Sequence, residues 1–351
     1  VFGIFRVLTD FNVGRIYLRF EGKNVICFGL IISGASTFML CFIKNIVLFA
    51  ILRVLQGVGS ALQATTAWAH LVYHSPEYRR SRNISYYSAS LIGGLTLGNF
   101  LGGYLIAIYN YSTLFIISSL ILLMGALYSY VFIPKKKEVE SHSSYKSKQR
   151  SYSMVSLYFI FLLGFSNFLI VQGFTSSVIQ LYIKNIFQVH SAHASMIIGI
   201  YNGASLISLL LFGGISDKIG REKPILIGFL IQILGYTTLI FYSNLILLYI
   251  ISLMVGFATA VSGPAILALL ADVTYQDPAA VSYYNAFRDL GFVLGPILAG
   301  LLFDIFNIIT VLLNYTTLLI VSLMIFGIEK SRKRHLVCSN LRFSIKKRIY
   351  S

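Results

Sequence analysis

The sequence predicts an all-α membrane protein made of two similar helical bundles, and three observations support this fold class. Hydrophobic residues make up 57% of the 351 residues, charged residues only 11%, and the mean hydropathy is +0.78, so a soluble fold lacks the polar residues needed to cover its surface. Charges and turn residues divide the chain into apolar segments of roughly 20 residues, the length of a membrane-spanning helix. The second half also repeats the first, which in membrane proteins is typical of transporters.

The repeat is clearest in one segment of each half. There the matching residues keep their order and spacing: Ser85, Tyr86, Tyr87, Ala89, Gly94 and Gly98 recur as Ser282, Tyr283, Tyr284, Ala286, Gly291 and Gly295. Further glycines match over most of each half, and these are Gly14, Gly29 and Gly57 with Gly213, Gly228 and Gly256. We therefore expect two bundles related by pseudo-symmetry.

Eleven apolar segments are expected to be helices that cross the membrane. They are 1–17, which is short, then 24–43, 46–71, 81–108, 112–133, 153–182, 192–215, 224–243, 245–271, 279–304 and 307–328. We divide the chain into an incomplete first bundle (1–133, helices 2–6), a polar linker (134–152), a six-helix bundle (153–328) and a basic tail (329–351). Because the repeat requires equal halves, we expect the first helix and part of the second to be missing from this chain.

Lys and Arg predict the orientation. If loops alternate sides, one side collects nearly all of them, in 15–23, 79–82, 135–150, 218–223 and the tail, whereas the other side has only Lys44 and Lys184. The positive-inside rule then places the linker and the carboxy terminus in the cytoplasm, and we expect a multi-pass protein of the plasma membrane. This asymmetry also explains the net charge of +16 without a nucleic-acid partner.

No motif of enzyme chemistry occurs. Hydrolase, Walker and dinucleotide-binding motifs are absent from the sequence, so we expect neither an enzyme nor a transporter driven by ATP hydrolysis. The three cysteines are Cys27, Cys41 and Cys338, and their scatter indicates no disulfide framework and no metal site. We expect no cofactor.

One loop of the second half resembles the signature GxxxDRxGR of the major facilitator superfamily, which joins the second and third helices of a half. The match is carried by Gly213, Asp217, Lys218, Gly220 and Arg221. The first-half copy, with Gly14, Arg19 and Lys23, is degenerate because Leu18 replaces the acid. The resemblance implies that Asp217 and Arg221 form a clasp that stabilises the outward-facing state, and we expect the first-half clasp to be weaker.

Two further patterns extend the resemblance over the whole chain. The fourth-helix pattern RxxQGxG of this superfamily is matched by Arg53, Gln56, Gly57 and Gly59. The fifth-helix pattern GxxxGPxxGG of its proton-coupled drug antiporters is matched by Gly94, Gly98, Gly102 and Gly103, with Asn99 in place of proline, and again by Gly291, Gly295, Pro296 and Gly300. These glycine rows predict close helix packing, and Pro296 predicts a softened helix.

Charged residues inside the apolar segments are the candidates for transport and coupling, because a central Arg or Asp costs roughly 2.5–3.5 kcal/mol on insertion scales. They are Arg6, Asp10, Arg53, Arg288 and Asp289. Arg6 and Asp10 are four residues apart and can pair on one helix face. Arg53 has no acid within a turn, so its partner is expected from another helix, a substrate or water.

Asp10 and Asp289 are the acids clearly within the membrane span. For each, a permanent ion pair and reversible protonation both remain open. Asp272, at a helix end, is interpreted as an interface residue. Polar residues that are candidates to line a cavity are Gln56, Gln172, Asn202 and Asn285.

These patterns favour a secondary transporter that moves a small molecule by alternating access, with proton-coupled export of a drug-like or metabolite substrate as the first hypothesis. The expected partners are this substrate, protons and membrane lipid, and the expected state is a monomer. One alternative is an uptake symporter or carrier for an organic anion or sugar, in which the arginines bind the substrate. Another is a sensor on the same fold that does not transport.

Overall fold

The computed structural model describes residues 1–43, 45–133, 154–190 and 192–349, with no side chains described at 103, 107, 154–156 and 329–349. This part of the chain is helical and contains no strand. Ten of its helices are long and apolar enough to cross a membrane. The first helix is not among these ten, and it carries Arg6, Asp10, Arg15 and Arg19 within 18 residues. The predicted linker 134–152 lies outside the described residues.

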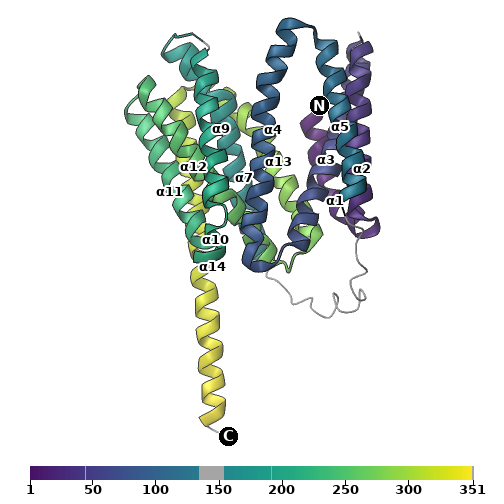
Figure 1. Ribbon diagram of the computed structural model, residues 1–351. Coiled ribbons are helices and arrows are strands. Elements are labelled where there is room, and N and C mark those ends of the chain that lie inside the picture. The colour runs from purple at the N-terminus through teal and green to yellow at the C-terminus, as the bar shows by residue number, and fades with distance from the viewer. Residues whose placement is uncertain (44, 134–153, 191, 350–351) are drawn as a thin grey trace.

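The first half contains five helices, which run from purple to blue in Figure 1. They are α1 (Phe2–Arg19), α2 (Gly22–Met39), α3 (Ile46–His74), α4 (Arg80–Ile108) and α5 (Tyr111–Phe132). Asn45 begins α3 by accepting a hydrogen bond from the backbone N–H of Val47 at 2.8 Å. This cap satisfies one of the amide groups that every helix start leaves unpaired.

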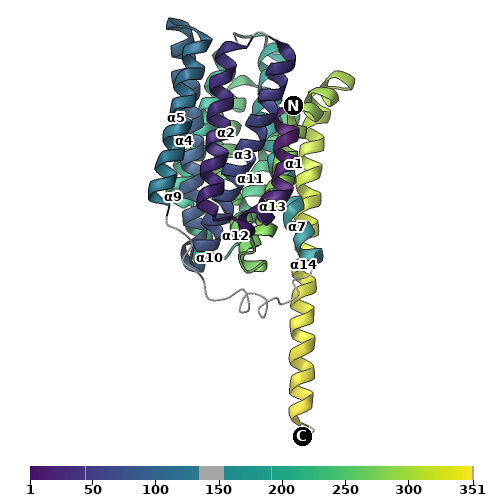
Figure 2. The ribbon, with the colours of Figure 1, turned by 90° about the vertical axis from the view of Figure 1, so that its right-hand side faces the viewer.

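The second half repeats this plan. Its helices are α7 (Met154–Gly173), which continues through π-helical turns at Phe174–Val178 and Tyr182–Ile186 around α8 (Ile179–Leu181), then α9 (Ala192–Phe212), α10 (Ile215–Ile219), α11 (Glu222–Phe241), α12 (Leu245–Val273), α13 (Pro278–Ile305) and α14 (Ile308–Ile349). Asn244 caps α12 as Asn45 caps α3. The helix α14 continues beyond its apolar segment and projects away from the bundles (Figure 2).

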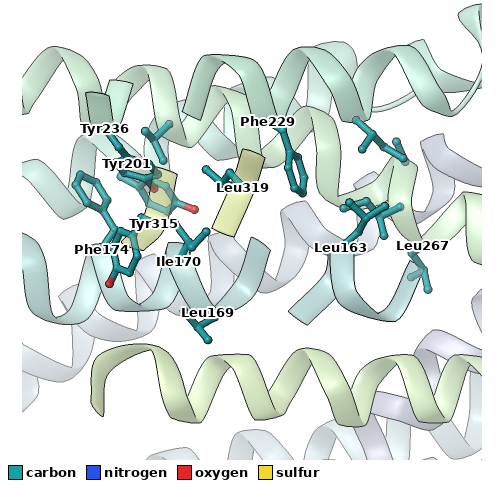
Figure 3. Close-up of a cluster of buried hydrophobic side chains, with 14 of the residues drawn as sticks. Leu163, Leu169, Ile170, Phe174, Tyr201, Phe229, Tyr236, Leu267, Tyr315 and Leu319 are labelled. Atoms are coloured by element: carbon teal, nitrogen blue, oxygen red, sulfur yellow. The ribbon is translucent and has the colours of Figure 1, made fainter. Parts of the chain in front are cut away.

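The larger core lies mostly in the second half and extends to Trp68, Val72 and Ile84 of the first half. Figure 3 shows Phe174 from the π-helical extension of α7, Tyr236 from α11 and Tyr315 from α14 packed together, and all three are buried. The buried apolar cluster of the first half is smaller and centres on Val13, with Val25 and Leu62. Many leucine, phenylalanine and isoleucine side chains are exposed, as expected for a surface solvated by lipid.

The two halves meet at two pseudo-symmetric helix crossings, α1 with α13 and α4 with α9, and further contacts join α3 to α13 and α4 to α12. At the first, the backbone N–H of Gly14 donates to Ser282 Oγ at 2.6 Å. At the second, Ser85 Oγ donates to the carbonyl of Gly213 at 3.1 Å. A side chain at Gly14 would collide with the backbone of Ala279, because a Cβ there would lie 2.6 Å from its Cα. Glycine therefore permits the close approach of the bundles.

Candidate functional site

Four charged residues gather where α1 of the first half meets α13 of the second. Arg6 and Asp10 come from α1, and Arg288 and Asp289 from α13. Arg6 Nε lies 2.5 Å from Asp289 Oδ2, while Arg288 donates through Nε and Nη2 to Asp289 Oδ1 at 3.0 and 2.9 Å. One carboxylate thus holds two guanidinium groups, one from each half. We call these four residues the inter-bundle cluster.

Asp10 is fully buried in this cluster but forms no ion pair with any described residue. Thr65 Oγ1 of α3 donates to Asp10 Oδ1 at 2.6 Å, and Ser282 Oγ donates to the Asp10 backbone carbonyl at 2.8 Å. The other carboxylate oxygen, Oδ2, has no hydrogen-bond partner among the described residues. The expected pairing of Arg6 with Asp10 is therefore not what the structure shows, because α13 presents Asp289 to Arg6 from across the interface.

Aromatic rings cover the Arg288 guanidinium. It lies 5.7 Å from the ring centroid of Trp68 on α3 and 5.1 Å from that of Phe168 on α7, so residues of both halves contribute to its cation–π contacts. The Trp68 ring packs edge-on against Tyr87 at 4.5 Å. On the same face of α13 as Ser282 and Asp289, the buried Asn285 amide has no hydrogen-bond partner among the described residues.

Arg53 lies apart from the inter-bundle cluster. Its Nη1 donates to Gln56 Oε1 at 3.1 Å, one turn along the same helix, and Gln56 Nε2 donates on to Thr37 Oγ1 of α2 at 2.8 Å. Among the described residues, the hydrogen-bond partner of Arg53 is thus an amide on its own helix, and the expected partner from another helix, a substrate or water stays a prediction. The arginine also lies 5.1 Å from the Phe49 ring.

The remaining cavity candidates are on the second half. Gln172 donates to Ser176 of the same α7 region at 2.6 Å, and Asn202 lies half-buried on α9. Among the described residues, no group of three or more His, Cys, Asp or Glu side chains is arranged to hold a metal ion.

The two glycine rows differ in their surroundings. A Cβ at Gly291 would lie 2.5 Å from the Phe165 carbonyl, and one at Gly295 would collide with the Leu169 carbonyl, so α13 packs tightly on α7. In the first half, Gly94 and Gly98 meet nothing within 4 Å. The expected packing at these positions has no partner in the described part of the chain.

The other members of these rows have looser surroundings. Gly102 has one neighbour, Leu114, at 3.6 Å, and the surroundings of Gly103 lie outside the description. Pro296 lies within α13, and its carbonyl accepts from Ser177 Oγ at 3.2 Å.

A second charged network ties the halves together at the end of the molecule that carries Gly14 and Gly213, which we call the basic end. Asp217 accepts from the backbone N–H groups of Ser81 and Arg82 at 3.0 Å each, and it forms an ion pair with Arg221. Its carboxylate therefore occupies the amino terminus of α4, where both the unpaired amides and the helix dipole favour a negative charge.

The same network includes two residues that sequence reasoning did not assign to it. Arg221 Nε donates to Asp272 Oδ2 at 2.8 Å, and Arg80 forms an ion pair with the same carboxylate. Arg221 also donates to the backbone carbonyl of Glu77 at 2.9 Å. In the sequence, Asp272 lies at a helix end with no basic residue nearby, and Arg80 lies in a basic loop. No sequence pattern therefore predicts that these two residues form an ion pair. Lys218 and Gly220 are exposed, and Gly220 takes a positive φ of 91° at the turn.

The degenerate first-half loop forms no ion pair in the described structure. Leu18 and Arg19 are exposed. Lys23 is buried, with its ammonium 4.4 Å from the ring centroid of Tyr130. Within the described residues, the charged clasp at the basic end is thus built on the second-half loop.

Comparison with known families decides the class of protein. The profile of the Major Facilitator Superfamily matches residues 1–165 and 157–337, which together cover nearly all of the chain. The chain belongs to this superfamily. As a Major Facilitator Superfamily transporter, it has the two-bundle helical fold that the sequence predicted, and its resemblance to the drug antiporters is confirmed by its relatives.

Two relatives show this resemblance. Multidrug resistance protein 2 of Bacillus subtilis is 25% identical over 315 residues, covering 87% of this chain and 78% of that protein. Multidrug resistance protein MdtG of Klebsiella pneumoniae is 26% identical over 272 residues, covering 73% of this chain and 64% of that protein. The chain therefore spans less than two thirds of MdtG.

Solved structures show the same superfamily fold. The human organic anion transporter MFSD10 superposes with a TM-score of 0.82 at 14% identity, covering 92% of this chain and 81% of that one. The transporter FucP in its outward conformation superposes with a TM-score of 0.73 at 16% identity, covering 91% and 85%.

Proposed function

We propose that this protein exports an amphipathic small molecule in exchange for protons. The observation that carries the proposal is the inter-bundle cluster, in which an ion pair between the half-buried Arg6 and the buried Asp289 joins the two halves beside the buried carboxylate of Asp10. An acid at such a position can link a change of protonation to a change of bundle contacts. The names of the bacterial relatives, multidrug resistance proteins, support export.

We also propose that the basic end lies in the cytoplasm, which the positive-inside rule supports, and that the protein lies in the plasma membrane. On this assignment, Asp217, Arg221, Asp272 and Arg80 close the cytoplasmic side, and the described state is outward-facing. Alternating access then requires that this clasp opens while contacts form between the outer ends of the bundles.

The clasp and the cluster have different roles in this mechanism. The clasp lies at the surface of the membrane and stabilises one conformation. The cluster lies deeper, at the crossing of α1 and α13, where protonation of an acid alters the attraction between the halves. The transported molecule is proposed to bind between the bundles near Trp68 and Phe168, whose rings come from α3 and α7. We propose a monomer as the working unit, because each bundle supplies half of this site.

A carrier for an organic anion is the second candidate. The observation that favours it is the pair of arginines, the half-buried Arg6 and the buried Arg288, which contact the same carboxylate. In this reading, a substrate carboxylate or phosphate would compete with Asp289 for the guanidinium groups.

Flux measurements on purified protein in liposomes separate these readings. Panels of amphipathic cations, neutral compounds and organic anions are offered with and without an imposed pH gradient. Gradient-driven accumulation of cations or neutral compounds supports proton-coupled export, and accumulation of anions alone supports the second candidate. Protein that is folded but moves no compound under either condition contradicts both.

A further inference from the structure

We propose that the outer part of the α4–α9 crossing is a lateral portal, through which the exported molecule passes from the space between the bundles into the outer leaflet of the membrane. The inference rests on the proposed function. It adds the substrate class, an amphiphile that resides in the bilayer, and the route of its release. The portal is the part of the crossing formed by Thr96 and Asn99 of α4 with Gly199, Asn202 and Gly203 of α9.

The opposite crossing, of α1 with α13, is closed along most of α1. At the basic end, a Cβ on Gly14 would lie 2.6 Å from the Cα of Ala279. Near the outer start of α1, a Cβ on Gly3 would lie 2.5 Å from Val293 Cγ2, and the inter-bundle cluster lies between these two contacts. The two helices therefore touch over about 16 Å of their length, which leaves no path to the lipid there.

The α4–α9 crossing is closed only near the basic end. There Ser85 Oγ donates to the carbonyl of Gly213 at 3.1 Å. Two turns further out, a Cβ on Gly93 would meet only Leu206, at 4.0 Å. Beyond this point, a Cβ on Gly203 would meet nothing within 4 Å. From Gly203 to the outer start of α9 the helix runs about 16 Å, close to half the thickness of the hydrocarbon core, about 15 Å.

The sequence explains why the two crossings differ. The repeat places Asn202 where α1 has Gly3, and Thr96 where α13 has Val293. Gly3 leaves room for the Val293 side chain, whereas Asn202 extends a side chain into the matching space. The exposed Thr96 turns back to its own helix, because its Oγ1 donates to the carbonyl of Ile92 at 2.8 Å. The opening thus follows from residues of this chain.

The composition of the portal fits an amphiphile. Thr96 and Asn99 are exposed and Asn202 is half-buried, while the large apolar side chains of Phe100 and Met196 on the same two helices are exposed. Polar groups that face hydrocarbon without a partner are unfavourable. A molecule with a polar head can pass along the hydroxyl and amide groups while its apolar chain stays in the lipid.

The portal leads to the region where the substrate is proposed to bind. One side of that region is Trp68, whose ring lies 5.7 Å from the Arg288 guanidinium. Tyr87 of α4 packs edge-on against Trp68 at 4.5 Å, so α4 runs from the binding region to the portal. Towards the basic end, Ala89 and Leu209 are buried together and close the crossing. A molecule beside Trp68 therefore has an exit on the outer side and none on the cytoplasmic side.

The first test asks whether lipid or water fills the portal. A nitroxide label on Asn202→Cys, in a background without the three cysteines, is measured in liposomes for collisions with oxygen, which concentrates in hydrocarbon, and with a water-soluble nickel chelate. Leu230→Cys is the reference, because Leu230 is exposed at a similar depth on α11. Both labels should collide often with oxygen and rarely with nickel. Adding Asp217→Asn, which removes the clasp, should lower the oxygen collisions of Asn202→Cys alone.

The second test blocks the portal with a large side chain. Gly203→Trp fills it, and Gly300→Trp is the matched control, because Gly300 of α13 is also half-buried and meets nothing within 4 Å. The probes are two fluorescent quaternary ammonium compounds, with a butyl or a dodecyl chain, whose release under a pH gradient is followed by external dithionite. The parent should move the dodecyl probe faster. Gly203→Trp should slow it by about tenfold or more, and Gly300→Trp should not.

Two results overturn the portal. One is a label on Asn202→Cys that collides with nickel and rarely with oxygen, because the opening is then filled with water. The other is dodecyl flux that is unchanged in folded Gly203→Trp, or reduced equally in Gly300→Trp. If the parent still shows gradient-driven flux, only the release route and substrate class are wrong. A parent that moves no compound under the gradient contradicts proton-coupled export itself, and the release route with it.

Discussion

Replacing Asp217 by asparagine should open the basic end of the molecule. Asp217 is 5% exposed as a side chain and makes two hydrogen bonds to backbone N–H groups of α4 and an ion pair with Arg221. The amide side chain of the Asp217→Asn variant retains one acceptor oxygen, so one hydrogen bond to α4 and the charge interaction with Arg221 are lost. Hydrogen bonds to charged groups contribute about 1.5–3 kcal/mol each, so the closed state should lose about 3 kcal/mol.

That loss corresponds to a shift of roughly 100-fold in the ratio of closed to open basic ends. Ile46 and Ile246 are exposed at the starts of α3 and α12, at the opposite end of the molecule from the basic end. Spin labels on Ile46→Cys and Ile246→Cys should therefore move from a long towards a short distance in Asp217→Asn. Leu18→Asn is the matched control, because Leu18 occupies the corresponding loop position and is 41% exposed. An unchanged distance distribution in Asp217→Asn, or an equal shift in both variants, would refute the reasoning that the clasp is asymmetric.

Three further predictions concern the stability of the folded protein and its transport driven by a pH gradient. Asp289→Asn should destabilise the folded protein by about 3–5 kcal/mol, because it leaves the buried Arg288 and the half-buried Arg6 without this counter-ion; a thermal midpoint in detergent equal to that of the parent would contradict this. Gly291→Ala should cost about 1–3 kcal/mol through collision with the α7 backbone, whereas Gly98→Ala, facing open space, should leave the melting temperature unchanged, and similar losses at both sites would count against the packing difference. Arg53→Lys should leave folding and gradient-driven flux close to those of the parent, since its contact is an amide rather than an acid; loss of gradient drive in folded protein would return Arg53 to a coupling role.

Much of the fold could be predicted from the sequence, because the signals involved are local or compositional. A chain with 57% hydrophobic residues has the bilayer as its solvent wherever its helices cross, and segment length alone separates spanning helices from loops. The predicted segments 81–108 and 279–304 match α4 and α13 to within one residue at each end. The ion pair inside the loop from Gly213 to Arg221 could also be predicted, because Asp217 and Arg221 are only four residues apart in the sequence.

Only the tertiary structure decided which charges meet across helices. Arg6 and Asp10 share a helix face, yet Arg6 pairs with Asp289, since the crossing of α1 and α13 sets a distance that no spacing along the chain encodes. The ion pairs of Asp272 with Arg80 and Arg221 likewise depend on how helices from the two halves pack, which the sequence spacing does not show.

The two glycine rows also show that sequence pattern and tertiary packing can differ. Gly98 and Gly295 occupy matching positions in the repeat, but only Gly295 has a helix packed against it in the described structure. Sequence by itself determined the solvent, the number of halves and the local motifs of this transporter, because these depend on composition and short spacings. The partners of its buried charges were decided by how the helices rotate and cross, because a buried charge takes the partner that packing presents to it.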